Sequence, residues 1–295
     1  MPGAVASRDG IVQILVGGAE QTAIQLVCLL GPFFLVGLLL HGLERLVQRH
    51  LSRHFGWGSI LWTGWLGTPV HETSHALLCL VFGHRIEEMA LFKPDRESGR
   101  MGYVRHSWNP GNPYAVVGNF FIGVAPLAGG ALVLYLFLWI FFPDAARGAL
   151  DAAGMAEAIA RGAFLEAGRS LFGMVTGVLG GIFTPAAFGH WKLWVFLYLV
   201  LCVGSHLAPS LQDYRGARRG ALVLLLLLLA GNLVFLVLGG KEGVLMASGA
   251  RVLGPALALF FLAAVLNSAI AVLVLGFTGL LDLIRGNAPW GKGGG

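Results

Sequence analysis

Long apolar runs separated by short polar segments make up most of this chain. A helix needs about 20 mostly apolar residues to cross a bilayer. Runs of about that length lie at residues 22–40, 59–83, 114–142, 191–207, 221–238 and 255–281. The pattern therefore predicts an all-α polytopic membrane protein with about six transmembrane helices.

The segments between these runs differ in character. Residues 44–55 are basic with apolar positions at helical spacing, which is typical of a helix lying along the membrane interface. Residues 143–170 carry balanced charges among many alanines and predict amphipathic helices outside the bilayer core. Residues 171–188 are apolar but close to the lower length limit for a crossing, and we interpret them as re-entrant or interfacial.

One stretch, residues 86–108, has the pattern of a small β-hairpin. Two runs at 86–92 and 100–108 flank the sequence K-P-D-R-E-S-G, in which Pro, Asp and Gly favour a turn. We therefore expect a hairpin directly after the second apolar run.

The composition agrees with a membrane protein. Hydrophobic residues make up 56% of the 295 positions and charged residues 12%, with a mean hydropathy of +0.76. Soluble domains carry about 25% charged residues, so this balance excludes a cytosolic enzyme, a disordered chain and a nucleic-acid reader. The net charge of +5 comes from Lys and Arg between the apolar runs, as expected for membrane-protein loops. Cys28, Cys79 and Cys202 fall inside apolar runs, and we interpret them as small core residues.

The second apolar run contains H-E-T-S-H, which is candidate chemistry at membrane depth. His71 and His75 are four residues apart, so a helix places both imidazoles on one face, as two ligands of one metal ion require. Glu72 lies beside them as the general base of a zinc-dependent hydrolase. Each ionisable residue near the bilayer centre costs about 2.5–3.5 kcal/mol, which favours a functional role. The alternative is a set of hydrogen bonds between helices.

Two histidines leave a Zn²⁺ site short of a protein ligand. The candidates elsewhere in the chain are Glu87, Glu88, Asp282, His206 and Asp213. We favour Asp213 as the third ligand. His206 precedes it by seven residues and would share its face on a continuous helix, unless Pro209 interrupts that helix. His206 is then an alternative ligand, or orients a ligand from outside the metal's coordination sphere.

Asn119 is a polar residue within the third apolar run. It is a candidate for binding an extended substrate backbone, and equally for an amide that packs helices together.

An H-E-x-x-H sequence inside a transmembrane helix resembles the site-2 protease family of intramembrane zinc metalloproteases. The resemblance covers residues 59–219 and implies a core of three helices, here 59–83, 114–142 and 191–213, with a β-hairpin after the first. It implies Zn²⁺ held by His71, His75 and an Asp ligand, which Asp213 matches by position, although the family's L-D-G sequence is absent. The implied activity is hydrolysis of a peptide bond in or near a transmembrane segment of a membrane protein substrate.

The chain is thus expected to comprise an N-terminal span with a basic interfacial helix (1–58), a metalloprotease-like core (59–219), two C-terminal spans (220–285) and a disordered tail (286–295). We predict a multi-pass protein of the cell (inner) membrane with both termini cytoplasmic. The lipid bilayer and a transmembrane protein substrate are the expected partners. Two other functions stay open: a non-catalytic assembly or transport component, and a zinc hydrolase acting on a lipid or small molecule.

Overall fold

The computed structural model describes residues 8–149, 158, 161–240 and 244–285, which are mostly helical. The helices are α1 (Arg8–Gln25), a π-helical turn (Leu26–Leu30), α2 (Gly31–Phe55), α3 (Trp57–Val81), α4 (Pro113–Phe141), α5 (Pro143–Ala149), α7 (Phe164–Ile182), a 3₁₀ turn (Pro185–Gly189), α8 (Trp191–Gly204), α9 (Leu211–Val237) and α10 (Val244–Ile284). The strands are β1 (Arg85–Ala90) and β2 (Tyr103–Ser107).

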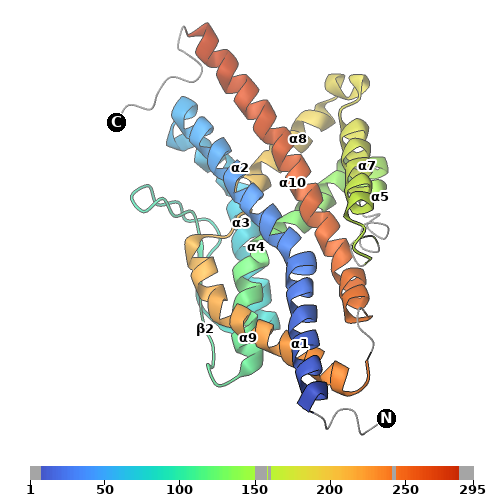
Figure 1. Cartoon of the computed structure of the whole chain (residues 1–295). Coiled ribbons are helices and arrows are strands. Elements are labelled where there is room, and N and C mark those ends of the chain that lie inside the picture. The colour runs from blue at the N-terminus through green and yellow to red at the C-terminus, as the bar shows by residue number, and fades with distance from the viewer. Residues whose placement is uncertain (1–7, 150–157, 159–160, 241–243, 286–295) are drawn as a thin grey trace.

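Helix α4 lies in the middle of the bundle (Figure 1) and packs against α3, α8, α9 and α10. This helix is apolar on all of its faces, as expected of a helix surrounded by other helices. Leu134 and Leu138 of α4 are fully buried with Leu193 and Phe196 of α8 and Leu262 of α10. This apolar cluster holds the framework on which the polar residues of α3 are placed.

Within the described residues, four helices are long and apolar enough to cross a membrane: Gly10–Phe55, Pro113–Phe141, Gln212–Val237 and Val252–Ile284. The chain therefore has the character of a membrane protein, whereas the prediction of six spans is not confirmed. Helix α3 lies where the sequence predicted a span, but it is not among the four, because its polar residues lower its mean hydropathy. Helix α8 has only 14 residues, and α7 is not among the four.

The ends of the predicted segments need correction. Helix α1 already begins at Arg8, and residues 44–55 continue α2 rather than forming a separate interfacial helix. The region predicted to hold amphipathic helices contains α5 and the start of α7, and residues 150–157 and 159–160 lie outside the described part of the chain. The predicted disordered tail, 286–295, also lies outside it.

The predicted hairpin is present directly after α3. Strands β1 and β2 are antiparallel, with Arg85 opposite Ser107, Ile86 opposite His106 and Ala90 opposite Tyr103. A bulge interrupts the register between Ile86 and Glu88. Bulges of this kind bend a strand and redirect its side chains, and here the bulge lies beside His106.

Helices α2 and α10 run parallel to each other. Phe33, near the start of α2, meets Phe260 in the first half of α10 edge to face at 5.0 Å, and near the ends of both helices His54 Nε2 lies 3.1 Å from Asp282 Oδ1. The start of α1 and the end of α10 accordingly lie at opposite ends of the bundle (Figure 1). Two parallel helices that both cross a bilayer would place these ends on opposite faces, which is an alternative to the prediction that both termini are cytoplasmic.

Cysteine labelling tests this topology. In a variant with its native cysteines replaced by serine, Asp9→Cys and Arg285→Cys are each introduced alone into oriented membrane vesicles. A membrane-impermeant maleimide should label the two positions from opposite sides. Labelling of both from the same side would show that α1–α2 and α10 do not both cross.

Candidate metal centre

The two histidines of the H-E-T-S-H sequence lie on one face of α3, as predicted. His71 Nε2 and His75 Nε2 are 3.2 Å apart. Helical geometry alone accounts for this, because residues four apart are stacked one turn above the other.

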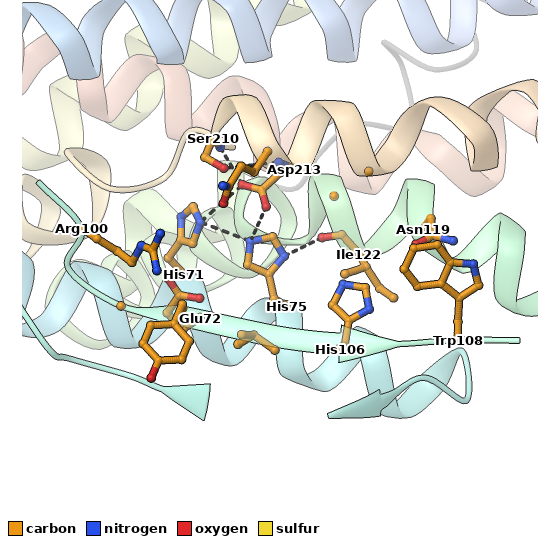
Figure 2. Close-up of a pocket in the computed structure, with 16 residues that line it drawn as sticks. His71, Glu72, His75, Arg100, His106, Trp108, Asn119, Ile122, Ser210 and Asp213 are labelled. Atoms are coloured by element: carbon orange, nitrogen blue, oxygen red, sulfur yellow. Dashed lines mark hydrogen bonds and ion pairs between the residues drawn. The ribbon is translucent and has the colours of Figure 1, made fainter. Parts of the chain in front are cut away.

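Asp213 supplies a carboxylate at the same point (Figure 2). Asp213 Oδ1 lies 3.3 Å from His75 Nε2, and Asp213 Oδ2 lies 3.8 Å from His71 Nε2. One ligand atom from each residue lies within 4.8 Å of the others. Of the five third-ligand candidates, Asp213 is the one that the structure brings to the histidines: Glu87 and Glu88 are exposed on the hairpin, and Asp282 pairs with His54.

Asp213 begins a helix instead of ending one. Helix α8 ends at Gly204, and Ser210 is the N-cap of α9. The Ser210 hydroxyl accepts the Asp213 N–H at 3.3 Å, and Asp213 Oδ2 accepts the Ser210 N–H at 2.6 Å, so the two residues form a capping box. The alternative of one continuous helix from His206 to Asp213 is wrong, because the chain is non-helical around Pro209.

His206 reaches the centre through its main chain. Its carbonyl oxygen accepts a hydrogen bond from His71 Nδ1 at 2.8 Å. Its imidazole Nδ1 lies instead 3.2 Å from the Cys202 carbonyl oxygen, next to α3 at Gly67. The structure therefore gives His206 the orienting position, and its ring lies outside the group formed by the two histidines and Asp213.

A proline on α4 explains the orientation of His75. His75 Nδ1 donates to the Ile122 carbonyl oxygen at 2.7 Å. In a regular helix that carbonyl would accept the N–H of residue 126, but Pro126 has no N–H. A carbonyl can only accept, so both His71 and His75 carry a proton on Nδ1, and Nε2 is the nitrogen that the neutral ring offers to a metal ion. Two such imidazoles and a carboxylate are a zinc-favouring set of ligands.

Helix α2 holds the loop between α8 and α9 in place. Glu44 Oε2 accepts the Ala208 N–H at 2.9 Å, and Gln48 Nε2 donates to the Ser205 carbonyl oxygen at 2.5 Å. These bonds satisfy loop backbone groups inside the bundle, where an unpaired group costs about 1–3 kcal/mol.

A cavity of about 540 Å³ lies at the candidate metal centre, and it is lined by residues of α3, α4, α9 and the hairpin. In Figure 2 it lies between α9 and β2. Besides the predicted residues, its lining includes Arg100, Tyr103, His106, Trp108 and Ser210. Sequence reasoning missed these five residues; only Ser210 had a local signal, the S-x-x-D pattern of a capping box.

Glu72 lies in this cavity and is 8% exposed. The chain of the hairpin passes directly over it at Gly102, where an added Cβ would stand 2.9 Å from Glu72 Cγ. Arg100 adds a positive charge to the lining. Burial and the neighbouring His84 lower the pKa of His106, which also lines the cavity, below its ordinary value, so its environment disfavours the protonated ring.

Asn119 also lines the cavity, but its amide nitrogen lies 3.4 Å from the carbonyl oxygens of Ala115 and Val116 in its own helix. Its placement agrees with contact to a bound substrate, which stays a prediction.

Comparisons with protein-family models, characterised proteins and solved structures found no match to this chain. The interpretation of the centre therefore depends on its own geometry.

Replacement of the third ligand tests the centre. Asp213→Ala should lower the zinc content of the purified protein by about one ion per chain, because two imidazoles alone hold zinc weakly. His206→Gln is the control and should retain that zinc, since only its main chain contacts His71. Zinc loss in the control with retention in Asp213→Ala would make His206 the ligand. Metal analysis after gel filtration provides the measurement.

A close contact between α4 and α9 gives a second test. An added Cβ at Gly123 would stand 2.7 Å from the Asp213 carbonyl oxygen. Gly123→Ala should therefore push Asp213 away and weaken zinc binding about 10–100-fold without removing a ligand. Gly173→Ala on α7, where a Cβ meets nothing within 4 Å, should leave the affinity unchanged. Equal affinities in a competition titration would show that this contact does not position Asp213.

Proposed function

We propose that this chain is an intramembrane zinc metalloprotease of the site-2 protease type, which hydrolyses a peptide bond in or near a transmembrane segment of a membrane protein. The observation that carries the proposal is the convergence of His71, His75 and Asp213 beside Glu72 in one cavity. A cell (inner) membrane location is part of the same proposal.

The residues of the centre fit a zinc ion. Both Nε2 atoms and the Asp213 carboxylate face one point, and the Nδ1 atoms are held by main-chain oxygens. Zinc bound there would supply Lewis-acid polarisation of the substrate carbonyl and acidification of water to a pKa of about 7.

Glu72 is suited to the proton transfers. As a buried carboxylate in the same cavity, it takes a proton from the attacking water and passes it to the amine that leaves. Its position directly after His71 on α3 keeps it beside the reacting atoms without making it a ligand.

The hairpin is suited to holding the substrate. A transmembrane helix must unwind before cleavage, because its carbonyls are hydrogen-bonded internally. A two-stranded sheet has two outer edges, and β2 forms a wall of the cavity. An extended substrate segment added along β2 would lie across the cavity, with Asn119 on the facing wall.

Glu72→Gln tests the catalytic role. This variant should retain zinc and the fold, and should lose hydrolysis about 10²–10⁴-fold because the proton acceptor alone is removed. Glu166→Gln on α7, which pairs with Arg161 at the surface, is the matched control and should cleave normally. Normal cleavage by the Glu72 variant would remove Glu72 as the base.

The inactive variant also distinguishes the substrate classes. Crosslinking of Glu72→Gln in native membranes should trap a transmembrane protein that the wild type releases as fragments. Zinc-dependent turnover of lipid without any trapped protein would instead favour the lipid hydrolase. Zinc binding with neither activity would favour the non-catalytic assembly component.

A further inference from the structure

Three potential metal ligands meet at the end of α3, outside the group around Asp213. They are Cys79, His84 and His106, and one ligand atom from each lies within 4.8 Å of the others. Cys79 is fully buried and His84 is 4% exposed. The proposed protease chemistry uses none of the three.

The end of α3 brings the first two together. The Gly83 N–H donates to the Leu80 carbonyl oxygen at 3.3 Å, and the His84 N–H donates to the Cys79 carbonyl oxygen at 2.8 Å. This is the hydrogen-bond pattern of a Schellman motif, in which Gly83 takes a positive φ of 69°. The motif folds the chain back, so that His84 lies over the last turn of the helix that carries Cys79.

The hairpin brings the third potential ligand, His106, to the same place. His106 lies on β2 opposite Ile86, next to the bulge in β1. His106 Nδ1 is 2.9 Å from His84 Nδ1. Trp108 lies against both rings, with centroid distances of 5.6 Å to His84 and 5.7 Å to His106.

The proton position on His84 leaves a lone pair at the cluster. His84 Nε2 lies 2.8 Å from the Ala115 carbonyl oxygen, which can only accept, so Nε2 carries a proton and Nδ1 is the nitrogen with the lone pair in the neutral ring. The centre around Asp213 repeats this arrangement, since its histidines also donate one ring nitrogen to main-chain oxygens and turn the other toward each other. In metal sites, such second contacts fix the tautomer that binds the ion.

Two imidazole nitrogens that face each other at 2.9 Å have between them either the hydrogen of an N–H···N hydrogen bond or a metal ion. A hydrogen bond explains the histidine pair alone. The Cys79 thiol at the same point supplies a third, soft donor that a hydrogen bond between histidines does not require. A tetrahedral zinc ion holds such nitrogens about 3.3 Å apart with Zn–N of about 2.0–2.1 Å, which needs only a small separation of the two rings.

We propose that Cys79, His84 and His106 form a second metal site, which binds Zn²⁺ and fixes the hairpin to the end of α3. A thiolate and two imidazoles are a donor set that zinc favours. Because His106 and Trp108 also line the large cavity, the bound ion holds one wall of that cavity in place. The site does not depend on the proposed protease function.

Cobalt provides the test, because a thiolate bound to Co²⁺ gives an intense near-ultraviolet charge-transfer band. The centre around Asp213 contains no sulfur, so the two sites are distinguishable. Full-length protein in detergent, stripped of metal, is titrated with Co²⁺. The band should appear in the wild type and persist in the His71→Ala/His75→Ala double variant, which removes the other centre. It should be absent from Cys79→Ser.

Cys28→Ser is the matched control, because Cys28 lies far along the chain in the π-helical turn, and it should keep the band. If Cys79→Ser fails to fold, His106→Gln replaces it: His106 is only half-buried on the hairpin, and its loss should weaken Co²⁺ binding at least about tenfold. A missing band in the wild type, a band retained in Cys79→Ser, or unchanged affinity in His106→Gln would overturn the proposal.

Discussion

The Asp213 carboxylate reaches the two histidines because the chain breaks between α8 and α9. A helix that starts inside a bundle exposes backbone N–H groups that have no partner within the helix. Ser210 and Asp213 satisfy two of them reciprocally, and the positive end of the helix dipole favours the carboxylate charge. The break thus produces both the position and the ionised state that a metal ligand needs. Glu44 and Gln48 of α2 hold the preceding loop, which is why the N-terminal helix contributes to the centre without touching it.

Backbone irregularities supply the rest of the polar environment. The interior of this bundle offers few acceptors, because regular helices use their own carbonyls. The two acceptors that orient the imidazoles come from exceptions: the His206 carbonyl lies in the loop, and the Ile122 carbonyl is released by Pro126. The close approach of α4 and α9 also has a local cause, which is a glycine. Gly123 lets α9 lie against α4 at Asp213, where any side chain would collide with the backbone.

The sequence predicts what depends on local spacing. The H-E-T-S-H pattern places His71, Glu72 and His75 correctly because helical periodicity alone decides their faces. The hairpin also follows from a local turn signal, and the apolar runs locate most of the helices.

The sequence does not predict how distant elements meet. The parallel packing of α2 and α10 depends on tertiary contacts, and so does the position of Arg100, His106 and Trp108 in the cavity. Asp213 does lie beside the two histidines, although it begins a helix where the sequence predicted the end of one, and its role as a ligand stays a prediction. Cys79 is buried, as the sequence predicts for a core residue, but its meeting with His84 and His106 is not predictable because it depends on a helix end and a hairpin.

The hairpin connects the two clusters and constrains both. A two-stranded sheet is marginally stable by itself and needs packing against other elements. At one end Gly102 lies against Thr68 and Glu72, so closely that an added Cβ would stand 2.8 Å and 2.9 Å from their side chains. At the other end His106 meets His84 beyond the last turn of α3. One attachment is to α3 itself and the other is just beyond its end, on either side of His75, so the hairpin lies along α3 across the cavity. A displacement at either attachment would move the cavity wall that faces Asp213, and the geometry of the metal centre therefore depends on an element that contributes no ligand to it.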